Sequence, residues 1–469
     1  MTAFNPWSSL AMAAQVRADG QAGGAGIRLQ QAHRLQRLLR HAAQRSPLYA
    51  QLLSGRSLAA QALSSLPVVR KPELMERFDE WVTDRRVTLQ GVRRFAEDPA
   101  NIGRPYLGRY MVWESSGSSR EPAVFVQEPQ AMAVYDALEA LRRPGLRPAQ
   151  RWMDPFWMTE RIAFVGAIDG HFASTVSMER LRCLNPLLGP RLHSLSFLQP
   201  MRELVAQLNA LQPTILTTYP SVAVVLAREA EAGRLRVPVR EVWTGGEDLS
   251  PAMRGCVERA FGCKVANSYG ASEFLTLAFE CHRASLHLNS DWAILEPVDE
   301  RGRPVPAGET GETTLLTNLA NRVQPLIRYD LRDRVRLHTQ PCACGSPLPV
   351  IEVQGRSDDT LVLGAQPGQA VAVPPLAVCT VLESDAGLFD FQLVQESPTR
   401  LLLRTGLAGA DADAALRRGR LVLRAYLHRL GLDGVEVHCL TTGSLPLGRS
   451  GKSRRIIGAP QPCAAPPVH

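Results

Sequence analysis

Lysine is almost absent from this chain of 469 residues, although basic residues are common. Of the 53 lysines and arginines, only Lys71, Lys264 and Lys452 are lysines. The two residue types are not interchangeable, because lysine carries a compact charge on a flexible stem. Either chance has retained these lysines or a flexible point charge is required at their positions, and Lys452 is the first candidate for such a role.

Long apolar runs are also missing. The longest ones are interrupted by Arg, Asp or Gly well before the roughly 18 consecutive apolar residues that a membrane-spanning helix needs. No basic segment precedes the short apolar stretch at the N-terminus, which argues against a secretory signal. We therefore expect a cytoplasmic protein without a membrane partner.

The cysteines and the charge exclude two further classes of protein. Nine cysteines, an odd number, are scattered along a long chain, so a disulfide framework is not indicated. The net charge of +8 would suit a nucleic-acid-binding protein, but acidic residues are interspersed among the basic ones throughout. We therefore expect reduced thiols and no nucleic-acid partner.

Length and patterning predict more than one domain. A chain of 469 residues with 45% hydrophobic content exceeds what one core usually serves. The pattern changes near Gly355 to Asp359, which predicts a domain boundary there. We predict a flexible Gly/Ala-rich leader at residues 1–26, a large domain at 27–355, a small mobile domain at 356–460 and a tail at 461–469.

The order of the expected elements predicts an α/β fold. An amphipathic helix is expected from Ile27 to about Ser46. From residue 111 to 350, β-rich runs (AVFVQ, IAFVGAI, TILTTY, EVWTGG, KVANSYG) alternate with helical segments, which favours largely parallel strands. Residues 292–319 have strands bounded by Gly/Pro turns, which indicates an antiparallel β subdomain. After residue 359, strands flank one long helix in a compact α+β unit.

Six short motifs follow one another along the chain. The first, SSGSSREP at 115–122, is a loop whose backbone N–H groups and hydroxyls can surround an anion, although alone it is equally a plain exposed turn. The others are TGGEDLS at 244–250, SYGASEF at 268–274, IRYDLRD at 327–333, GRSDD at 355–359 and LPLGRSGKSRRI at 445–456. Together they resemble the adenylate-forming superfamily of acyl-CoA synthetases, and most closely its phenylacetate-CoA ligase branch, over residues 30 to 456.

The resemblance implies a binding site for ATP and Mg²⁺. Tyr269 matches the aromatic residue that stacks on adenine, Asp333 the acid that accepts hydrogen bonds from the ribose hydroxyls, and Glu273 the carboxylate that holds Mg²⁺. The chain departs from the family pattern at Arg120 and Arg332, where glycine is usual, and at Glu121, where lysine is usual. The implied nucleotide-binding residues are Ser116, Gly117, Ser118, Ser119, Arg120, Gly245, Gly246, Glu247, Tyr269, Gly270, Ser272, Asp333 and Arg356.

The resemblance also implies two chemical steps at one site. Lys452 matches the lysine that reaches the reacting carboxylate and the α-phosphate, where positive charge stabilises the transition state. Asp358 or Asp359 matches the hinge about which the small domain turns. The implied function is ATP-dependent conversion of a carboxylic acid to an acyl adenylate, followed by transfer to the thiol of coenzyme A. The alternatives are transfer to a carrier-protein thiol or an amine, and a non-catalytic nucleotide-binding scaffold.

The identity of the carboxylic acid depends on a pocket that the sequence indicates weakly. His171, Phe172 and Tyr219 lie where this family builds the wall around its substrate. Aromatic side chains suit a flat aryl acid, but each of them fits a core position as well. The possible partners are thus a small aromatic carboxylate, an acyl carrier protein and, as a homodimer, a second copy of the chain.

Four further residues suggest a structural metal. Cys281 and His287 form a Cys-x5-His pair, and Cys342 and Cys344 form a Cys-x-Cys pair. His282 and His338 lie nearby and compete with His287 for the histidine position. These spacings differ from those of common zinc fingers, but four such ligands can close a tetrahedral Zn²⁺ site. Some members of the branch carry zinc at similar positions, so the resemblance favours Zn²⁺, and buried free thiols are the alternative.

Overall fold

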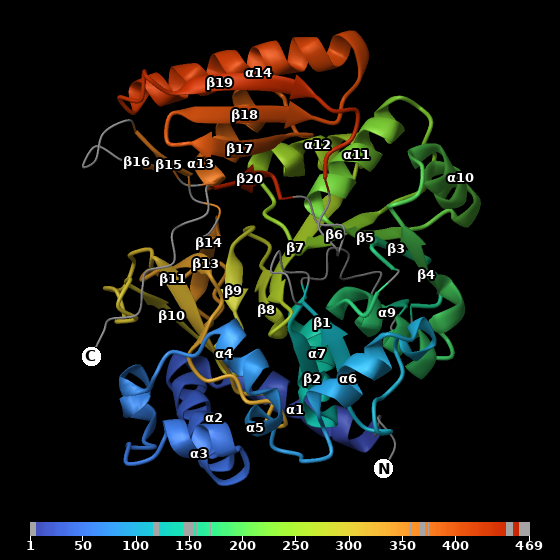
Figure 1. Ribbon diagram of the computed structural model, residues 1–469. Helices are drawn as coiled ribbons and strands as arrows, with labels where there is room; N and C mark the ends of the chain where they lie inside the picture. Colours follow the sequence, from blue (N-terminus) through green and yellow to red (C-terminus); the bar gives the residue numbers. More distant parts are fainter. Residues whose placement is uncertain are drawn as a thin grey trace.

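The computed structural model describes residues 6–115, 122–143, 153–154, 157–168, 170–356, 359, 361–364, 371–373, 375–446 and 454–458. These residues have a mixed α/β fold, as predicted, with a large part that ends at β14 and a small part that begins at β15 (Figure 1). The small part has an apolar cluster of its own, from Leu361 to Ile456. The exact domain limits stay a prediction.

A nine-stranded mixed sheet runs through the large part in the order β13, β14, β9, β8, β7, β6, β5, β3 and β4. The pairs from β7 to β4 are parallel, and the pairs from β7 to β13 are antiparallel. The parallel half confirms the predicted alternation of strands and helices. The strands are β3 (Ile162–Gly166), β4 (Leu192–Ser196), β5 (Ile215–Thr218), β6 (Glu241–Gly245), β7 (Lys264–Ala271), β8 (Phe274–Glu280), β9 (Leu286–Leu288), β13 (Asp333–Leu337) and β14 (Val350–Arg356).

Helices α10, α11 and α12 pack on the parallel half of this sheet. Leu208, Val224 and Val257, one from each helix, share a buried cluster with Leu216 of β5 and Val242 of β6. These crossovers are expected, because parallel neighbours cannot be joined by a tight turn. The helices that follow the strands of the large part are α7 (Pro129–Arg142), α9 (Ala173–Leu184), α10 (Met201–Leu211), α11 (Pro220–Glu231) and α12 (Pro251–Phe261).

Two small antiparallel sheets complete the large part. Strands β1 (Met111–Glu114) and β2 (Val124–Gln127) form a hairpin whose connection is the SSGSSREP loop. Strands β10 (Ala293–Val298), β11 (Thr313–Asn318) and β12 (Tyr329–Asp330) form the other. The pairing of β10 with β11 confirms the antiparallel strands predicted at residues 292–319.

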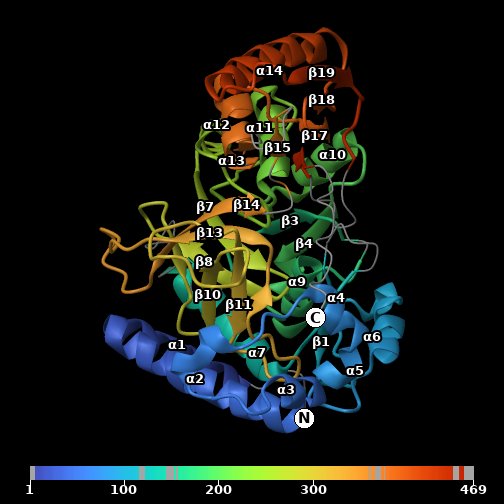
Figure 2. The same cartoon turned by 60° about the vertical axis from the view of Figure 1, so that its left-hand side comes forward.

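The N-terminal residues differ from the predicted flexible leader. They form α1 (Pro6–Gln21) and the start of α2 (Gly23–Arg45), which lie along the base of the molecule in Figure 2. Met12 and Val16 of α1 are buried in the main core, where α1 packs on α7. The leader prediction was wrong for residues 6–26, because alanine-rich sequence favours helix and apolar packing offsets the cost of the glycines. The end of α2 at Arg45 confirms the predicted break before Pro47.

Short helices lead from α2 to β1 and connect some of the later strands. They are α3 (Pro47–Leu52), η1 (Ala60–Ser65), α4 (Lys71–Glu76), α5 (Phe78–Trp81), α6 (Leu89–Ala96), η2 (Pro99–Asn101) and η3 (Gly189–Arg191). No helix among the described residues is long and apolar enough to cross a membrane.

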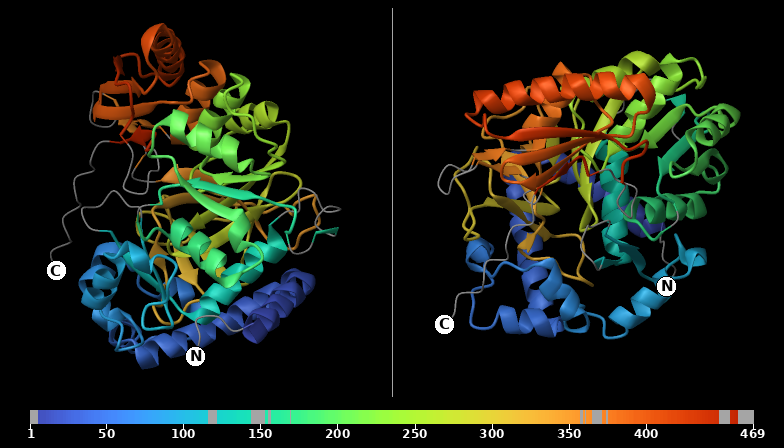
Figure 3. Two further views of the ribbon diagram at one scale, coloured as in Figure 1. Left: turned by 90° about the vertical axis from the view of Figure 1, so that its right-hand side faces the viewer. Right: turned by 45° about the horizontal axis from the view of Figure 1, so that its top comes forward.

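The small part is a four-stranded sheet covered by one long helix. Its order is β19, β18, β17, β20, and α14 (Gly409–Arg429) is the crossover between the parallel strands β18 and β19. Figure 1 and the left view of Figure 3 show this unit at the top of the molecule, and in Figure 1 it lies beside α11 and α12. Its elements confirm the strands and the helix predicted after residue 359. Besides α14, the elements of the small part are β15 (Leu361–Leu363), β16 (Val371–Val373), α13 (Pro375–Thr380), η5 (Val381–Asp385, a π-helix), β17 (Gln392–Ser397), β18 (Arg400–Thr405), β19 (Glu436–Thr441) and β20 (Ile456–Ile457).

A buried ionic network ties the N-terminal helices to α7 and to the segment between β9 and β10. Arg142 of α7 binds both carboxylate oxygens of Asp291 at 2.6–2.7 Å. Arg34 of α2 donates to the backbone carbonyl of Asp291 at 2.7 Å, pairs with Asp19 of α1 and stacks 3.5 Å from the ring centre of Trp292. Asp291 is 0% exposed, so its charge is compensated only through these partners.

We predict that Asp291→Ala lowers the free energy of unfolding by about 3–5 kcal/mol, because it leaves buried guanidinium groups without their anion. Urea denaturation of the full chain measures this loss. The control is Glu309→Ala, which removes an exposed acid and should change the free energy by less than about 0.5 kcal/mol. A loss as small as that of the control would contradict the role of the network.

Candidate functional site

Three of the predicted nucleotide-binding side chains meet at one end of the central sheet. The hydroxyl of Tyr269, near the end of β7, donates to Asp333 Oδ2 at 2.5 Å. Asp333 begins β13 and lies directly opposite Arg356, the last residue of β14, and their charged groups are 3.6 Å apart. Burial is the main cause of the raised pKa of Tyr269, and Asp333 adds to it. Tyr269 and Asp333, which are 64 positions apart in sequence, thus form one polar group with Arg356.

Glu273 lies on the same turn, between β7 and β8, and is held from two sides. Tyr329 of β12 donates its hydroxyl to Glu273 Oε1 at 2.9 Å, and the amide of Asn318 donates to the Glu273 carbonyl at 2.9 Å. Burial raises the pKa of the Glu273 carboxyl, and the hydrogen bond from Tyr329 opposes that rise. The carboxylate therefore has a fixed orientation.

The turn itself explains two of the predicted residues. A Cβ on Gly270 would lie 1.9 Å from the carbonyl oxygen of Leu275, so this bulge of the β7–β8 pair requires glycine. The carbonyl of Ser272 accepts a hydrogen bond from the Trp113 indole of β1 at 2.8 Å. This bond ties the turn to the hairpin that carries the serine-rich loop.

The TGGEDLS motif ends β6 beside this turn. Gly245 pairs with Ser268 of β7, and Gly246 has φ of +79°, a conformation that favours glycine. The carboxylate of Glu247 accepts a hydrogen bond from the backbone N–H of Ser221, at the start of α11, at 3.1 Å. The motif therefore borders the candidate site through its backbone and through Glu247.

Arg332 shows why the family pattern has glycine at its position. Its φ is +59°, in the left-handed region, which costs a non-glycine residue about 1–2 kcal/mol. Its backbone N–H donates to Asp330 at 3.0 Å, which helps to hold the turn before β13.

Lys71 belongs to the candidate site, although no motif pointed to it. It begins α4, two residues after Val69, which pairs with Tyr329 of β12. Its Nζ donates to Ser115 Oγ, at the base of the serine-rich loop, at 3.3 Å. Burial lowers the pKa of Lys71, and the nearby Glu273 opposes that shift. The rarity of lysine was the only signal in the sequence that could have found it, whereas Tyr329 lies inside the IRYDLRD motif.

The residues predicted to line the acyl pocket are mostly enclosed. His171 is 3% exposed and packs against Phe95 at 5.9 Å between ring centres, and burial lowers its pKa. Tyr219 is 5% exposed and packs against Phe197 at 5.9 Å, and burial raises its pKa to about 12. Phe172 caps α9. Their packing is that of core residues, and their contact with substrate stays a prediction.

Some predicted site residues lie outside the described residues. These are Ser116, Gly117, Ser118, Ser119, Arg120, Asp358 and Lys452.

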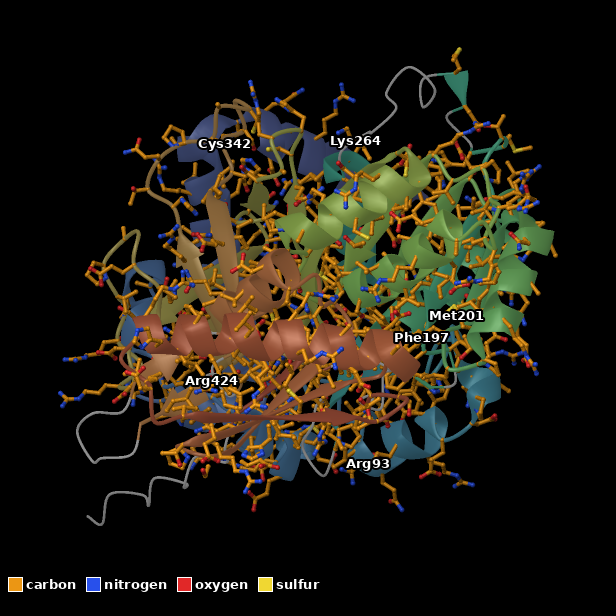
Figure 4. The ribbon with its side chains drawn as sticks, turned by 90° about the horizontal axis from the view of Figure 1, so that it is seen from above. Arg93, Phe197, Met201, Lys264, Cys342 and Arg424 are labelled. Atoms are coloured by element: carbon orange, nitrogen blue, oxygen red, sulfur yellow. The ribbon has the colours of Figure 1, made fainter. Side chains whose placement is uncertain are left out.

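The four predicted metal ligands come together at the other end of the β13–β14 hairpin. The ligand atoms of Cys281, His287, Cys342 and Cys344 lie within 4.8 Å of one another. The Sγ atoms of Cys281 and Cys342 are 3.9 Å apart, and Cys344 Sγ is 3.3 Å from His287 Nε2. Figure 4 labels Cys342 on the side of the molecule away from Arg424 of α14.

Hydrogen bonds around the four side chains orient them to bind a cation. His287 Nδ1 lies 2.9 Å from the carbonyl of Leu348, which directs Nε2 toward the thiols. The backbone N–H of Cys344 lowers the pKa of Cys342, whereas burial raises the pKa of Cys344, so Cys342 is the one of the two that more readily forms the thiolate that metals bind. Backbone N–H groups also point at the sulfurs of Cys281 and Cys344. The donor set and its support therefore fit a tetrahedral metal.

Comparisons with known proteins agree with this geometry. Residues 179–316 match the family model described as AMP-binding enzyme. The phenylacetate-coenzyme A ligase of Thermus thermophilus is 24% identical over 462 residues, which cover 92% of this chain and 96% of that protein.

A 2-hydroxyisobutyryl-CoA ligase, solved in the postadenylation state with its acyl adenylate, superposes with a TM-score of 0.66 at 20% identity, over 92% of this chain and 89% of that one. The same ligase in its thioesterification state gives a TM-score of 0.53 at 20% identity, over 91% and 88%. Sequence, fold and the meeting of Tyr269, Glu273 and Asp333 agree: residues 179–316 match the AMP-binding enzyme family, and the chain shares the fold of a solved acyl-CoA ligase.

Proposed function

We propose that this protein is an ATP-dependent ligase that joins a carboxylic acid, most favourably an aromatic one, to the thiol of coenzyme A through an acyl adenylate. The observation that carries this proposal is the polar group in which Tyr269, Asp333 and Arg356 lie beside Glu273. The match to phenylacetate-coenzyme A ligases supports the choice of an aromatic acid and of coenzyme A.

In the first step, a carboxylate oxygen of the substrate attacks the α-phosphorus of ATP, and the bond to the β-phosphate breaks. The Tyr269 ring and the Asp333 carboxylate bind the adenosine. Glu273 would hold Mg²⁺, which supplies charge neutralisation between the phosphates. In the second step, the thiolate of coenzyme A attacks the acyl carbon, and AMP leaves with the electrons of the broken acyl–phosphate bond. Lys452 is proposed to supply positive charge in the first step.

The arrangement of the two parts is closer to that of a ligase which holds its acyl adenylate after the first step than to that of a ligase in thioester formation. The two structures are of one named ligase in two states of its reaction, and we take their different TM-scores to reflect conformation. The higher score for the postadenylation state supports a corresponding placement of the small part here.

The test is carboxylate-dependent pyrophosphate release from ATP and Mg²⁺, screened over aryl, arylacetic, heteroaromatic and fatty acids. We expect release with an aryl acid, and a thioester only when coenzyme A is added. Release without a thioester would shift the acceptor to a carrier-protein thiol or an amine. If no acid supports release although ATP binds, the nucleotide-binding scaffold becomes the better description. A homodimer stays a prediction from the sequence.

In this proposal Lys71 supplies the positive charge that the serine-rich loop lacks, because Glu121 stands where the family usually has a lysine. We expect Lys71→Met to slow adenylate formation about 100-fold, because a cation beside the β- and γ-phosphates stabilises the departing pyrophosphate. Transfer from a supplied acyl adenylate should change little, because that compound lacks those two phosphates. Single-turnover assays of each step measure the difference.

The matched control for Lys71 is Lys264→Met. Lys264 is 75% exposed at the start of β7, and Figure 4 labels it on the outer surface. Both steps should proceed normally in this variant. An equal loss of both steps in Lys71→Met, with an unchanged melting temperature, would remove Lys71 from the phosphate site.

The cluster of Cys281, His287, Cys342 and Cys344 is proposed to hold a structural Zn²⁺. It would join the β8–β9 turn to the β13–β14 loop and so stiffen the hairpin whose far end carries Asp333 and Arg356. Reduced thiols are needed for this role, which agrees with the proposed cytoplasmic location.

We predict about one zinc per chain by metal analysis of the purified protein. Changing Cys342 and Cys344 to Ser should remove the zinc and lower the melting temperature. The exposed Cys183, changed to Ser, is the control and should leave the metal content unchanged. Wild-type protein purified without chelators and free of zinc would exclude the metal site.

A further inference from the structure

A buried ion pair lies where the small part meets the large part. Arg455, which precedes β20, pairs with Glu383 of η5, and their side chains are 12% and 0% exposed. The guanidinium also lies 4.4 Å from the ring centre of Phe391. All three residues belong to the small part, so this arrangement travels with it as a unit.

Two contacts from this pair cross to the large part. The hydroxyl of Ser250, the N-cap of α12, donates to the Glu383 carboxylate. Arg455 Nη1 lies 3.8 Å from the Met253 sulfur in the first turn of α12. Glu247 of the TGGEDLS motif is close enough to act on the charge of Arg455. The start of α12 is therefore the surface on which the ion pair rests.

The same ion pair restrains the chain next to Lys452. Arg455 follows Lys452 by three residues, so their Cα atoms are at most about 11 Å apart. Backbone bonds fix the chain after Lys452 to β17: Leu393 N–H donates to the Arg455 carbonyl at 2.7 Å, and the Gln392 side chain donates to the Arg454 carbonyl at 3.0 Å. Holding Arg455 against α12 therefore limits where Lys452 can reach.

We propose that Glu383 is a positioning residue for the adenylation step: bound to Ser250 and Arg455, it holds the chain that carries Lys452 against the large part. This inference rests on the proposed function. Rotation of the small part for the second step must separate Glu383 from Ser250 and Arg455 from Met253. The contact thus stabilises the arrangement of the two parts that is used for adenylation. It must break before the small part can rotate for thioester formation.

The sharpest test is Ser250→Asp. Aspartate is as good an N-cap as serine, so α12 keeps its start, but the introduced carboxylate repels Glu383. We expect adenylate formation to slow at least 10-fold, while thioester formation from a supplied acyl adenylate stays within about 3-fold of wild type. Adding Glu383→Gln should restore the first step, because an amide donates to the introduced carboxylate.

Two controls separate this role from a general loss of structure. Glu396→Gln changes an acid of β17 away from the contact and should leave both steps unchanged. Melting temperatures show that each variant folds. Equal losses of both steps in Ser250→Asp, or no loss in either, would overturn the proposal, as would failure of the double variant to recover.

Hydrogen–deuterium exchange supplies a readout that does not depend on the reaction. Amides of residues 454–458 should exchange faster in Ser250→Asp than in wild type. In the double variant their exchange should slow toward the wild-type rate. Unchanged exchange would overturn the inference whether or not the protein proves to be a ligase. An absence of pyrophosphate release in wild type, together with this exchange pattern, would instead count against the proposed function alone.

Discussion

Strand β7 pairs in parallel with β6 and antiparallel with β8, and the candidate site depends on this double pairing. The parallel pairing sets Gly245 beside Ser268, and the antiparallel pairing forces the bulge at Gly270. Between these two constraints the chain must turn sharply, and Tyr269 and Glu273 emerge on that turn. Asp333 and Arg356 reach the same place because β13 and β14 extend the antiparallel half. The change of strand direction thus creates the place where the motifs meet.

The sequence predicted four of the nine strands of the central sheet, β3, β5, β6 and β7, because buried β-rich runs and amphipathic helices have distinct periods. It also predicted Tyr269, Glu273 and Asp333 as one site, since they lie in motifs of a known family. It missed Lys71, whose place depends on the pairing of Val69 with Tyr329, 260 positions later in the sequence. It was wrong about residues 6–26, because the packing of Met12 and Val16 on α7 cannot be read from local composition.

The preference for arginine has a structural counterpart. Arg34, Arg142, Arg328 and Arg455 are largely buried side chains that each pair with a carboxylate. A planar guanidinium is more weakly hydrated than an ammonium and satisfies several acceptors at once, so it suits such positions better than lysine. These buried charge pairs therefore use arginine, while Lys71 lies in the polar site and Lys264 at the surface.

Strand β20, near the C-terminal end of the chain, is short but anchors that end in the small sheet by pairing with β17. Only Ile456 and Ile457 form this strand, yet the adjoining Arg454 and Arg455 pair with Asp359 and Glu383. A protease that trimmed the chain just before residue 454 would leave the whole large part intact and remove both anchors together. Such trimming in a preparation would yield a protein of nearly full mass that lacks β20 and the contact of Arg455 with Met253 of α12, so intact-mass measurement should accompany any judgement of its activity.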